Sequence, residues 1–189
     1  MWHDLLAAGI ECGLHSIERL MRRNGLSARP RRRRLPIDLG DRSAAALSAN
    51  VLDLFSRRVV GWSMSAAMTA EPVTDALVMA IWRRGRPRQL LHHSDRGSQY
   101  TSEAFQRLMA EHGVACSLSR SGNVWDNAAM ESFFSSLKVE RVARKIYRTR
   151  DEARADVFDY IERFYNPRRR HSTIGYLSPM EFEATVRLA

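Results

Sequence analysis

Cysteine and lysine are both scarce in this chain of 189 residues, and long apolar runs are missing from it. Cys12 and Cys116 are the only cysteines, and their spacing fits neither a metal site nor a disulfide framework. Two isolated thiols are typical of a protein from a reducing compartment. No apolar stretch approaches the length of a membrane span, and the N-terminus has no signal-peptide pattern. We therefore expect a soluble, cytoplasmic protein.

The few lysines leave a charge balance dominated by arginine. Of the 30 cationic residues, 28 are arginines and only Lys138 and Lys145 are lysines. A net charge of +9 and a pI near 10.5 indicate a polyanionic partner, most often nucleic acid. Arginine suits bidentate contact with phosphate, although a coding bias across a genome produces the same excess. The charge thus favours nucleic-acid binding, and the arginine excess adds weak support.

The order of the expected helices and strands indicates an α/β fold. Apolar periodicity, capping residues and breakers predict helices over 3–24, 69–85, 102–111, 126–141, 149–165 and from 178 onward, and strands over 51–55, 59–64, 89–93 and 114–118. A turn near Ser56 joins the first two strands. Such an order is typical of a sheet flanked by helices.

Gly25 is expected to end the first helix, and Asn166 with Pro167 the helix that starts at Thr149. Thr69, Ser102, Thr149 and Ser178 are expected to cap their helices. The helix over 69–85 is expected to bury its apolar side, which consists of Val73, Ala76, Leu77, Ala80 and Ile81.

Two stretches near the N-terminus allow more than one interpretation. The basic run Arg31, Arg32, Arg33 and Arg34 is either a solvated linker or an arm that binds phosphate. Residues 35–50 contain Asp38, Asp41 and an alanine cluster without clear strand alternation, so a loop or a short helix is expected there.

Two acids stand where phosphoryl-transfer enzymes place metal ligands. Asp95 follows an apolar strand, Glu131 lies on a predicted helix, and 35 residues separate them. Met130, Phe134 and Leu137 repeat at helical spacing and predict the buried side of that helix. Glu131 and Lys138 fall on a different side, so Glu131 is expected to face a cleft. Two carboxylates so placed can hold a divalent metal for phosphoryl transfer.

Four stretches together resemble one protein family: VLDLFSRRVVGWSM (51–64), HHSDRGSQYTS (92–102), residues 119–138, and FDYIERFYNPRRRHSTIGYLSPMEF (158–182). In these motifs the chain is similar to OrfB-type insertion-sequence transposases of the retroviral-integrase superfamily. The resemblance implies a ribonuclease-H-like core, Mg²⁺ or Mn²⁺ as cofactor, and cleavage and transfer of DNA strands at element ends. It also implies that Asp95 and Glu131 are the second and third acids of the family's signature, and that residues 1–34 derive from a helix-turn-helix-like region.

The resemblance has one gap. Relatives carry their first acid on an opening strand, in a Trp-x-x-Asp motif, and no such motif occurs before residue 51. Asp53 belongs to the second-strand motif, and Asp38 and Asp41 have unsuitable surroundings. We therefore expect an internal deletion, with a basic helical segment over 1–34, a linker over 35–50 and a core over 51–189 that lacks its first strand. In the family the first acid bridges two metal ions. Because the deletion would remove this acid, impaired or absent catalysis is expected.

Several residues keep two interpretations at this stage. Lys138 and the run Arg168, Arg169 and Arg170 are either DNA contacts or ordinary solvated cations. Asp126 either supports the site or caps its helix, and His92 and His93 are expected to be satisfied locally in their strand. The rival hypotheses are a non-catalytic remnant that binds element ends or intact transposase, and an unfolded product without a role. Expected partners are the element ends, target DNA and further copies of the chain.

Overall fold

The computed structural model describes residues 2–26, 49–65, 69–85, 90–94, 97, 99–118, 128–143 and 145–188. The chain divides into two compact units, Met1–Ile37 and Asp38–Ala189, and each is described by itself. Asp38, Asp41, Asp95, Asp126 and the run from Arg31 to Arg34 lie outside the described residues. Within the described ranges, no helix is long and apolar enough to cross a membrane.

The first unit contains two helices where one was predicted. Helices α1 (Trp2–Ala7) and α2 (Leu14–Arg23) are separated at Gly9, whose φ of +76° cannot continue a right-handed helix. The indole of Trp2 donates a hydrogen bond to the carbonyl of Cys12 at 2.9 Å and so closes the connection. The single helix over 3–24 was therefore wrong. The predicted stop is confirmed, because Gly25 adopts a φ of +63° directly after α2.

The second unit begins with the predicted hairpin. Strands β1 (Ala49–Leu52) and β2 (Val59–Ser63) pair antiparallel, starting with Ala49 opposite Ser63. Oδ1 of Asp53 accepts hydrogen bonds from the main-chain N–H groups of Phe55 and Ser56 at 2.9 and 3.0 Å. These two bonds form the turn by the mechanism expected of an aspartate at its start.

Helix α3 (Glu71–Arg83) packs directly on the hairpin at a glycine. A Cβ atom on Gly61 would lie 1.9 Å from the carbonyl oxygen of Ala76, so only glycine allows this approach. The predicted buried side of α3 is confirmed, with its apolar residues in the core: Val73, Ala76, Leu77, Ala80 and Ile81. The predicted cap at Thr69 is wrong, since Ala70 precedes the helix without a side-chain cap.

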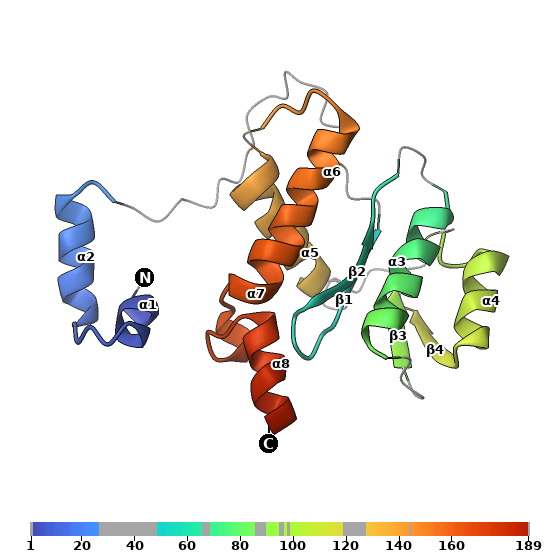
Figure 1. Ribbon diagram of the computed structural model, residues 1–189, viewed down its shortest axis with the longest axis horizontal. Helices are drawn as coiled ribbons and strands as arrows, with labels where there is room; N and C mark the ends of the chain where they lie inside the picture. The colour runs from blue at the N-terminus through green and yellow to red at the C-terminus, as the bar shows by residue number, and fades with distance from the viewer. Residues whose placement is uncertain are drawn as a thin grey trace. The chain divides into compact units, whose positions relative to one another are not determined.

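A second pair of strands follows in a β–α–β unit. Strands β3 (Leu90–Ser94) and β4 (Val114–Leu118) pair in parallel and are connected through α4 (Glu103–Glu111) (Figure 1). The hydroxyl of Ser102 accepts a hydrogen bond from the N–H of Phe105 at 3.4 Å, which confirms the predicted cap. Phe105 and Met109 hold α4 in the core.

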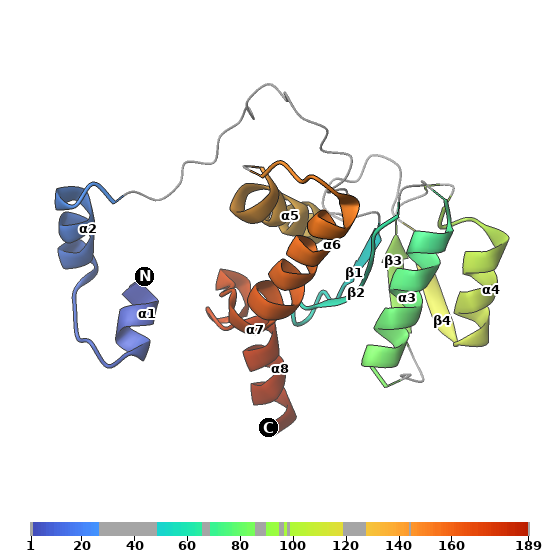
Figure 2. The ribbon, with the colours of Figure 1, turned by 45° about the horizontal axis from the view of Figure 1, so that its top comes forward.

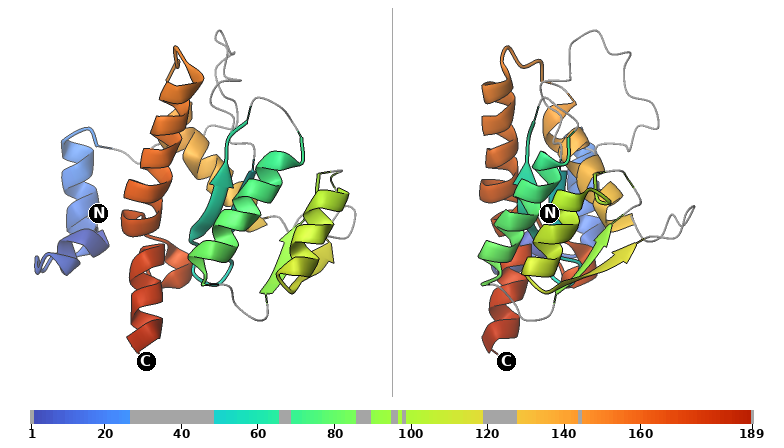
Figure 3. Two further views of the ribbon diagram at one scale, coloured as in Figure 1. Left: turned by 45° about the vertical axis from the view of Figure 1, so that its right-hand side comes forward. Right: turned by 90° about the vertical axis from the view of Figure 1, so that its right-hand side faces the viewer.

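Helices cover both faces of the hairpin. Ala49 belongs to a core cluster with α3, α4 and β4, whereas Leu52 belongs to a second cluster with Phe133, Val157 and Tyr160 from the C-terminal helices. Figure 3 shows α3 on one side of the hairpin, with β3, β4 and α4 beside it. The described strands nevertheless form two separate two-stranded sheets, β1–β2 and β3–β4.

The C-terminal half is helical. It consists of α5 (Ala128–Leu137), the π turn η2 (Lys138–Val142), α6 (Arg150–Phe158), the π turn η3 (Asp159–Tyr165), α7 (Asn166–Arg168), the short η4 (Ser172–Ile174) and α8 (Pro179–Leu188). Figures 1 and 2 both show α6 running beside α5. Thr149 and Ser178 cap their helices as predicted, each accepting a hydrogen bond from the N–H of the glutamate three residues later. The helix does not end at Asn166, because helical structure continues to Arg168.

The predicted buried stripe of α5 is partly wrong. Leu137 is buried, but Phe133 (1% exposed) takes the core position that the spacing had given to Phe134 (38% exposed). Phe133 packs edge-to-face against Tyr165, with ring centroids 5.0 Å apart. The side of α5 with Met130 and Phe134 lines a cavity instead.

Candidate functional site

Glu131 projects from α5 into a cavity between the two sheets. The helix is anchored by Phe133 and Leu137, which are buried against the C-terminal helices, while Glu131 stays exposed. Within the described residues the Glu131 carboxylate has no hydrogen-bond or ion-pair partner. The predicted outward position of this acid is therefore confirmed.

The cavity has a volume of about 560 Å³ and is bounded mainly by β1, β3, α3 and α5, with Val60 of β2 also in the lining. Strands β1 and β3 contribute their full lengths, α3 contributes Leu77, Ala80 and Arg84, and α5 contributes Ala129, Met130, Glu131 and Phe134. Ser94, the last residue of β3, lies in the same lining as Glu131. Asp95 is the next residue in the chain, outside the described residues. The structure thus brings the end of β3 and Glu131 to one cavity.

Asp53 also lines the cavity, but both of its carboxylate oxygens are engaged in structural contacts. Its Oδ2 pairs with the guanidinium of Arg84 at 2.6 Å, and its Oδ1 holds the hairpin turn. Arg84 in turn pairs with Glu183 of α8 at 2.5 Å. Burial alone would raise the pKa of Glu183, but hydrogen bonds from Arg84, Ser56 and Arg58 outweigh it and lower that pKa. This network fastens the hairpin to α3 and α8.

The two histidines of β3 differ. Nδ1 of His93 lies 3.1 Å from the hydroxyl of Ser117, across the β3–β4 pair, as expected for a locally satisfied side chain. Nε2 of His92 is buried and has no hydrogen-bond partner among the described residues, so the expectation fails there. Burial, and secondly the neighbouring His93, lower the pKa of His92, which keeps the ring neutral near pH 7.

The predicted DNA-contacting cations separate into two groups. Lys138 and Arg168 are exposed, and their charged groups form no hydrogen bond or ion pair with another described residue. Arg169 is different, since it donates to both carboxylate oxygens of Glu140 at 2.8–3.2 Å and to Ser136 at 2.9 Å. Arg170 is exposed like Lys138 and Arg168, but like Arg169 it interacts with other groups.

Arg169 organises a cluster that the sequence had not revealed. The hydroxyl of Tyr160 donates to Glu140 at 2.8 Å, and the guanidinium of Arg169 lies 5.6 Å from the ring centre of Tyr165. Burial and the nearby charges of Arg169 and Arg57 lower the pKa of His171 to about 4. Because Ser136 and Glu140 flank the junction of α5 with η2, the cluster fixes the helix that carries Glu131. No local pattern signals the bonds of Arg169 to Ser136 and Glu140, which lie 33 and 29 positions earlier in the chain.

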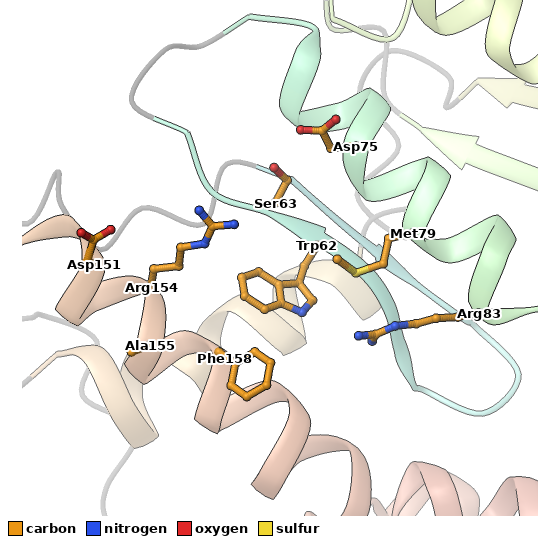
Figure 4. Close-up of a pocket in the computed structure, with 9 residues that line it drawn as sticks. All are labelled: Trp62, Ser63, Asp75, Met79, Arg83, Asp151, Arg154, Ala155 and Phe158. Carbon is orange, nitrogen blue, oxygen red and sulfur yellow. The ribbon is translucent and has the colours of Figure 1, made fainter.

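A second cavity of about 570 Å³ lies between β2, α3 and α6 (Figure 4). Its floor contains Trp62 and Phe158, with ring centroids 6.2 Å apart. The indole of Trp62 donates to Glu162 at 2.9 Å, and Arg83 pairs with the same carboxylate at 2.8 Å. Its other charged residues, Asp75, Asp151 and Arg154, are of both signs. This composition offers no concentrated negative charge for a cation.

The chemistry of the first cavity fits a hard divalent cation. Magnesium and manganese prefer oxygen ligands and commonly bind through one or two carboxylates, with water and substrate phosphate completing the shell. Glu131 is an accessible, uncommitted carboxylate in that lining. Among the described residues no group of three or more ligating side chains occurs. The described part of the site therefore supplies one carboxylate ligand.

Family models match most of the chain. The integrase core domain matches residues 37–124, a second integrase core domain description matches residues 131–186, and an HTH-like domain matches residues 1–34. Glu131 is the first residue of the second match.

Curated relatives show the same similarity. The chain is 52% identical over 135 residues to transposase InsF for insertion sequence IS3A of Escherichia coli, covering 71% of this chain and 47% of that protein. It is 44% identical over 137 residues to the transposase for insertion sequence element IS904 of Lactococcus lactis, covering 72% and 54%. The chain thus spans about half the length of the curated relatives that it matches.

A solved structure shows the same fold. The intasome of simian T-cell lymphotropic virus superimposes with a TM-score of 0.57 at 17% identity, covering 74% of this chain and 49% of that one. The predicted α/β fold of the ribonuclease-H-like integrase type is thereby confirmed.

Proposed function

Because the chain belongs to the integrase-core family of insertion-sequence transposases, we propose that it is a metal-dependent DNA strand-transfer protein with impaired catalysis. The observation that carries the proposal is the shared cavity, in which Ser94 at the end of β3 and Glu131 on α5 both take part. Asp95 and Glu131 would hold Mg²⁺ or Mn²⁺. Impairment follows from the absence of a third acid in a recognisable opening-strand motif.

The bound metal would activate the attacking oxygen and stabilise the leaving oxygen at a phosphodiester. The chain's own residues position the DNA. Lys138, the first residue of η2, lies about two turns beyond Glu131, and its exposed ammonium can contact a phosphate. Arg169 acts indirectly, because its bonds to Ser136 and Glu140 hold the end of α5 in place.

Metal binding tests the site without relying on turnover. Titration of the full chain with Mn²⁺, followed by electron paramagnetic resonance, should show weaker binding in Glu131→Gln and in Asp95→Ala. Glu103→Gln is the matched control, because Glu103 is exposed on α4 and pairs with Arg107 of the same helix. Equal Mn²⁺ affinity in all four proteins would contradict the proposed ligands.

Cleavage of a labelled terminal-repeat duplex tests the impairment. We expect binding with little or no cleavage in Mn²⁺. Efficient metal-dependent cleavage that Asp95→Ala abolishes would show that the site is complete, and would overturn the impairment while keeping the ligand assignment.

A second function, DNA binding without catalysis, is favoured by a separate observation. The net charge is +9, the HTH-like match covers residues 1–34, and Lys138 and Arg168 are exposed cations. Each phosphate contact adds to the salt dependence of binding, so Lys138→Gln should lower the slope of log K against log salt by about 1. Arg107→Gln on α4 should leave the slope unchanged. Binding to element ends, to intact transposase or to further copies of the chain would then be its role.

A further inference from the structure

Arg57 follows the turn of the β1–β2 hairpin in a backbone conformation that favours glycine. Its φ is 61°, and within the described ranges Arg57 and Tyr176 are the two residues other than glycine with a positive φ. A residue with a Cβ atom adopts this left-handed region at a cost, and glycine is the usual residue where a hairpin turn requires it. The chain nevertheless has an arginine at this position.

Hydrogen bonds on both sides of Arg57 fix its backbone. On the N-terminal side, the hydroxyl of Ser56 donates to Glu183 of α8 at 2.7 Å. On the C-terminal side, the N–H of Val59 donates to the side chain of Asn166 of α7 at 2.9 Å. A strained residue persists only where its surroundings determine its conformation, and such residues gather at sites that bind ligands. The position from which the Arg57 side chain extends is therefore set by α7 and α8.

The charge of Arg57 lacks a counter-charge, unlike the charges of neighbouring arginines. Arg58 pairs with Glu183 at 2.7 Å, and Arg169 pairs with Glu140 at 2.8 Å. Arg57 is half-buried and forms no hydrogen bond or ion pair with another described residue. One guanidinium group at this surface is therefore available to an anion from outside the chain.

A second guanidinium and an imidazole belong to the same surroundings. The rings of Tyr165 and His171 have their centres 5.0 Å apart, and Nη1 of Arg169 lies 3.5 Å from Nε2 of His171. Burial, followed by the charges of Arg169 and Arg57, lowers the pKa of His171 to about 4, and the carboxylate of Glu140 opposes this effect. Two positive charges therefore act on His171 against one negative charge.

We propose that Arg57, with Arg169 and His171 beside it, forms a binding site for a phosphate group. A guanidinium group presents its N–H donors in the planar arrangement that phosphate oxygens accept, and an imidazole can donate one further N–H. A bound phosphate would supply the counter-charge that Arg57 lacks among the described residues. The net charge of +9 also attracts polyanions to the chain.

The proposed phosphate site is separate from the cavity of Glu131. Glu140, which pairs with Arg169, follows Glu131 by nine residues, or roughly 13 Å along a helix. The proposal therefore goes beyond the proposed function and depends on neither metal binding nor strand cleavage. The phosphate belongs either to a DNA backbone or to a small phosphate compound, and two probes distinguish these sources.

The variants Arg57→Gly and Arg57→Asn separate phosphate binding from folding. Glycine and asparagine both adopt a φ near +60° more readily than arginine does, and neither carries a charge. The urea midpoint of unfolding should therefore equal that of the parent or rise, while phosphate binding weakens. A lower midpoint in both variants would mean that the arginine serves the fold, and would overturn the proposal.

Inorganic phosphate is the first probe, added to the full chain without metal and at constant ionic strength. Nuclear magnetic resonance should show saturable shifts of the Arg57 Nε–Hε signal and of the His171 amide. The Kd measured at His171 should be at least tenfold weaker in both Arg57 variants. Arg107→Gln should bind as the parent does, because Arg107 is exposed on α4 and pairs with Glu103 of the same helix.

A DNA duplex of arbitrary sequence is the second probe. If the phosphate belongs to DNA, both Arg57 variants should lower the slope of log K against log salt by about 1, and Arg107→Gln should not. A loss confined to inorganic phosphate would identify a small phosphate compound as the source. Binding like that of the parent with both probes, or equal losses in Arg107→Gln, would overturn the proposal. Neither probe requires metal or cleavage, so failure here remains distinct from failure of the proposed function.

Discussion

Polar groups on the two strands of the β1–β2 hairpin differ in whether the rest of the molecule supplies hydrogen-bond partners for them. At the outer edge, the buried side-chain amide of Asn166 accepts a hydrogen bond from the N–H of Val59 at 2.9 Å and donates one to its carbonyl at 3.0 Å. At the inner edge, Asn50 is partly buried beside a cavity, and its buried amide nitrogen has no hydrogen-bond partner in the described residues.

This contrast shows which buried polar groups of the hairpin are satisfied within the described residues and which are not. A buried main-chain group without a partner costs about 1–3 kcal/mol, and Asn166 avoids that cost for two groups at once. On β1, by contrast, the side-chain nitrogen of Asn50 is buried without a hydrogen-bond partner in the described residues, so a cost of this kind remains there.

The largest loss of stability is expected from Gly61→Ala in β2. The added Cβ would lie 1.9 Å from the carbonyl oxygen of Ala76, so β2 and α3 have to separate. Overpacking usually costs about 1–3 kcal/mol, and a clash with backbone at this distance should exceed about 3 kcal/mol. Urea unfolding followed by circular dichroism measures the loss. Gly13→Ala is the control, because its nearest neighbour is 3.9 Å away, and less than about 1 kcal/mol is expected.

Asn166→Ala and Asn50→Ala compare the two edges directly. Removing Asn166 leaves the N–H and C=O of Val59 buried without partners, so a loss of about 2–4 kcal/mol is expected. Removing Asn50 deletes an amide whose nitrogen is already unpartnered, so its loss should stay below about 1 kcal/mol. Thermal unfolding of the two variants measures the difference. Similar losses at both positions would mean that the inner edge is as well satisfied as the outer one.

The same contrast separates what the sequence predicts from what it does not. The hairpin, α3, the β3–α4–β4 unit and the caps at Ser102, Thr149 and Ser178 depend on signals within a few residues, and these predictions were confirmed. The break at Gly9 was missed because the apolar stripe continues on both sides of it. The spacing in α5 could not distinguish Phe133 from Phe134, since Tyr165, far along the chain, decides which ring is buried.

The candidate site, like the fold, was predictable only where the signal lies within a few residues of the chain. Strand and helix patterns were enough to place Glu131 on the exposed side of its helix. They could not show that Arg169 is committed to Glu140, because 29 positions separate the two and neighbouring arginines have the same pattern. Asp95 lies outside the described residues, so its role stays a prediction.

The fall in unfolding free energy at low pH tests the ion-pair network of Asp53, Arg84 and Glu183, which fastens the turn of the hairpin. The pKa of Glu183 is lowered, so the stability it contributes is present above the unfolded-state pKa near 4.5 and is lost as the pH falls through the lower folded value. Glu183→Gln should therefore flatten the fall in unfolding free energy below about pH 4.5. Glu103→Gln on the surface of α4 should keep the slope of the parent. An unchanged slope in Glu183→Gln would mean that other acids dominate that limb.

The last effect is confined to the pH dependence of stability and comes from His171, next to the cluster of Arg169 that supports α5. Burial and the charges of Arg169 and Arg57 lower its pKa to about 4, whereas in the unfolded chain it titrates near 6.5. Between these values the unfolded state binds more protons, so stability rises with pH by at most about 1.4 kcal/mol per pH unit. His171→Gln should remove that rise between pH 4 and 6.5 and leave stability above pH 7 less affected. His15→Gln, exposed on α2, is the control. If the two variants show the same pH dependence, the cluster does not hold His171 neutral, and the end of α5 is fixed less firmly than its hydrogen bonds indicate.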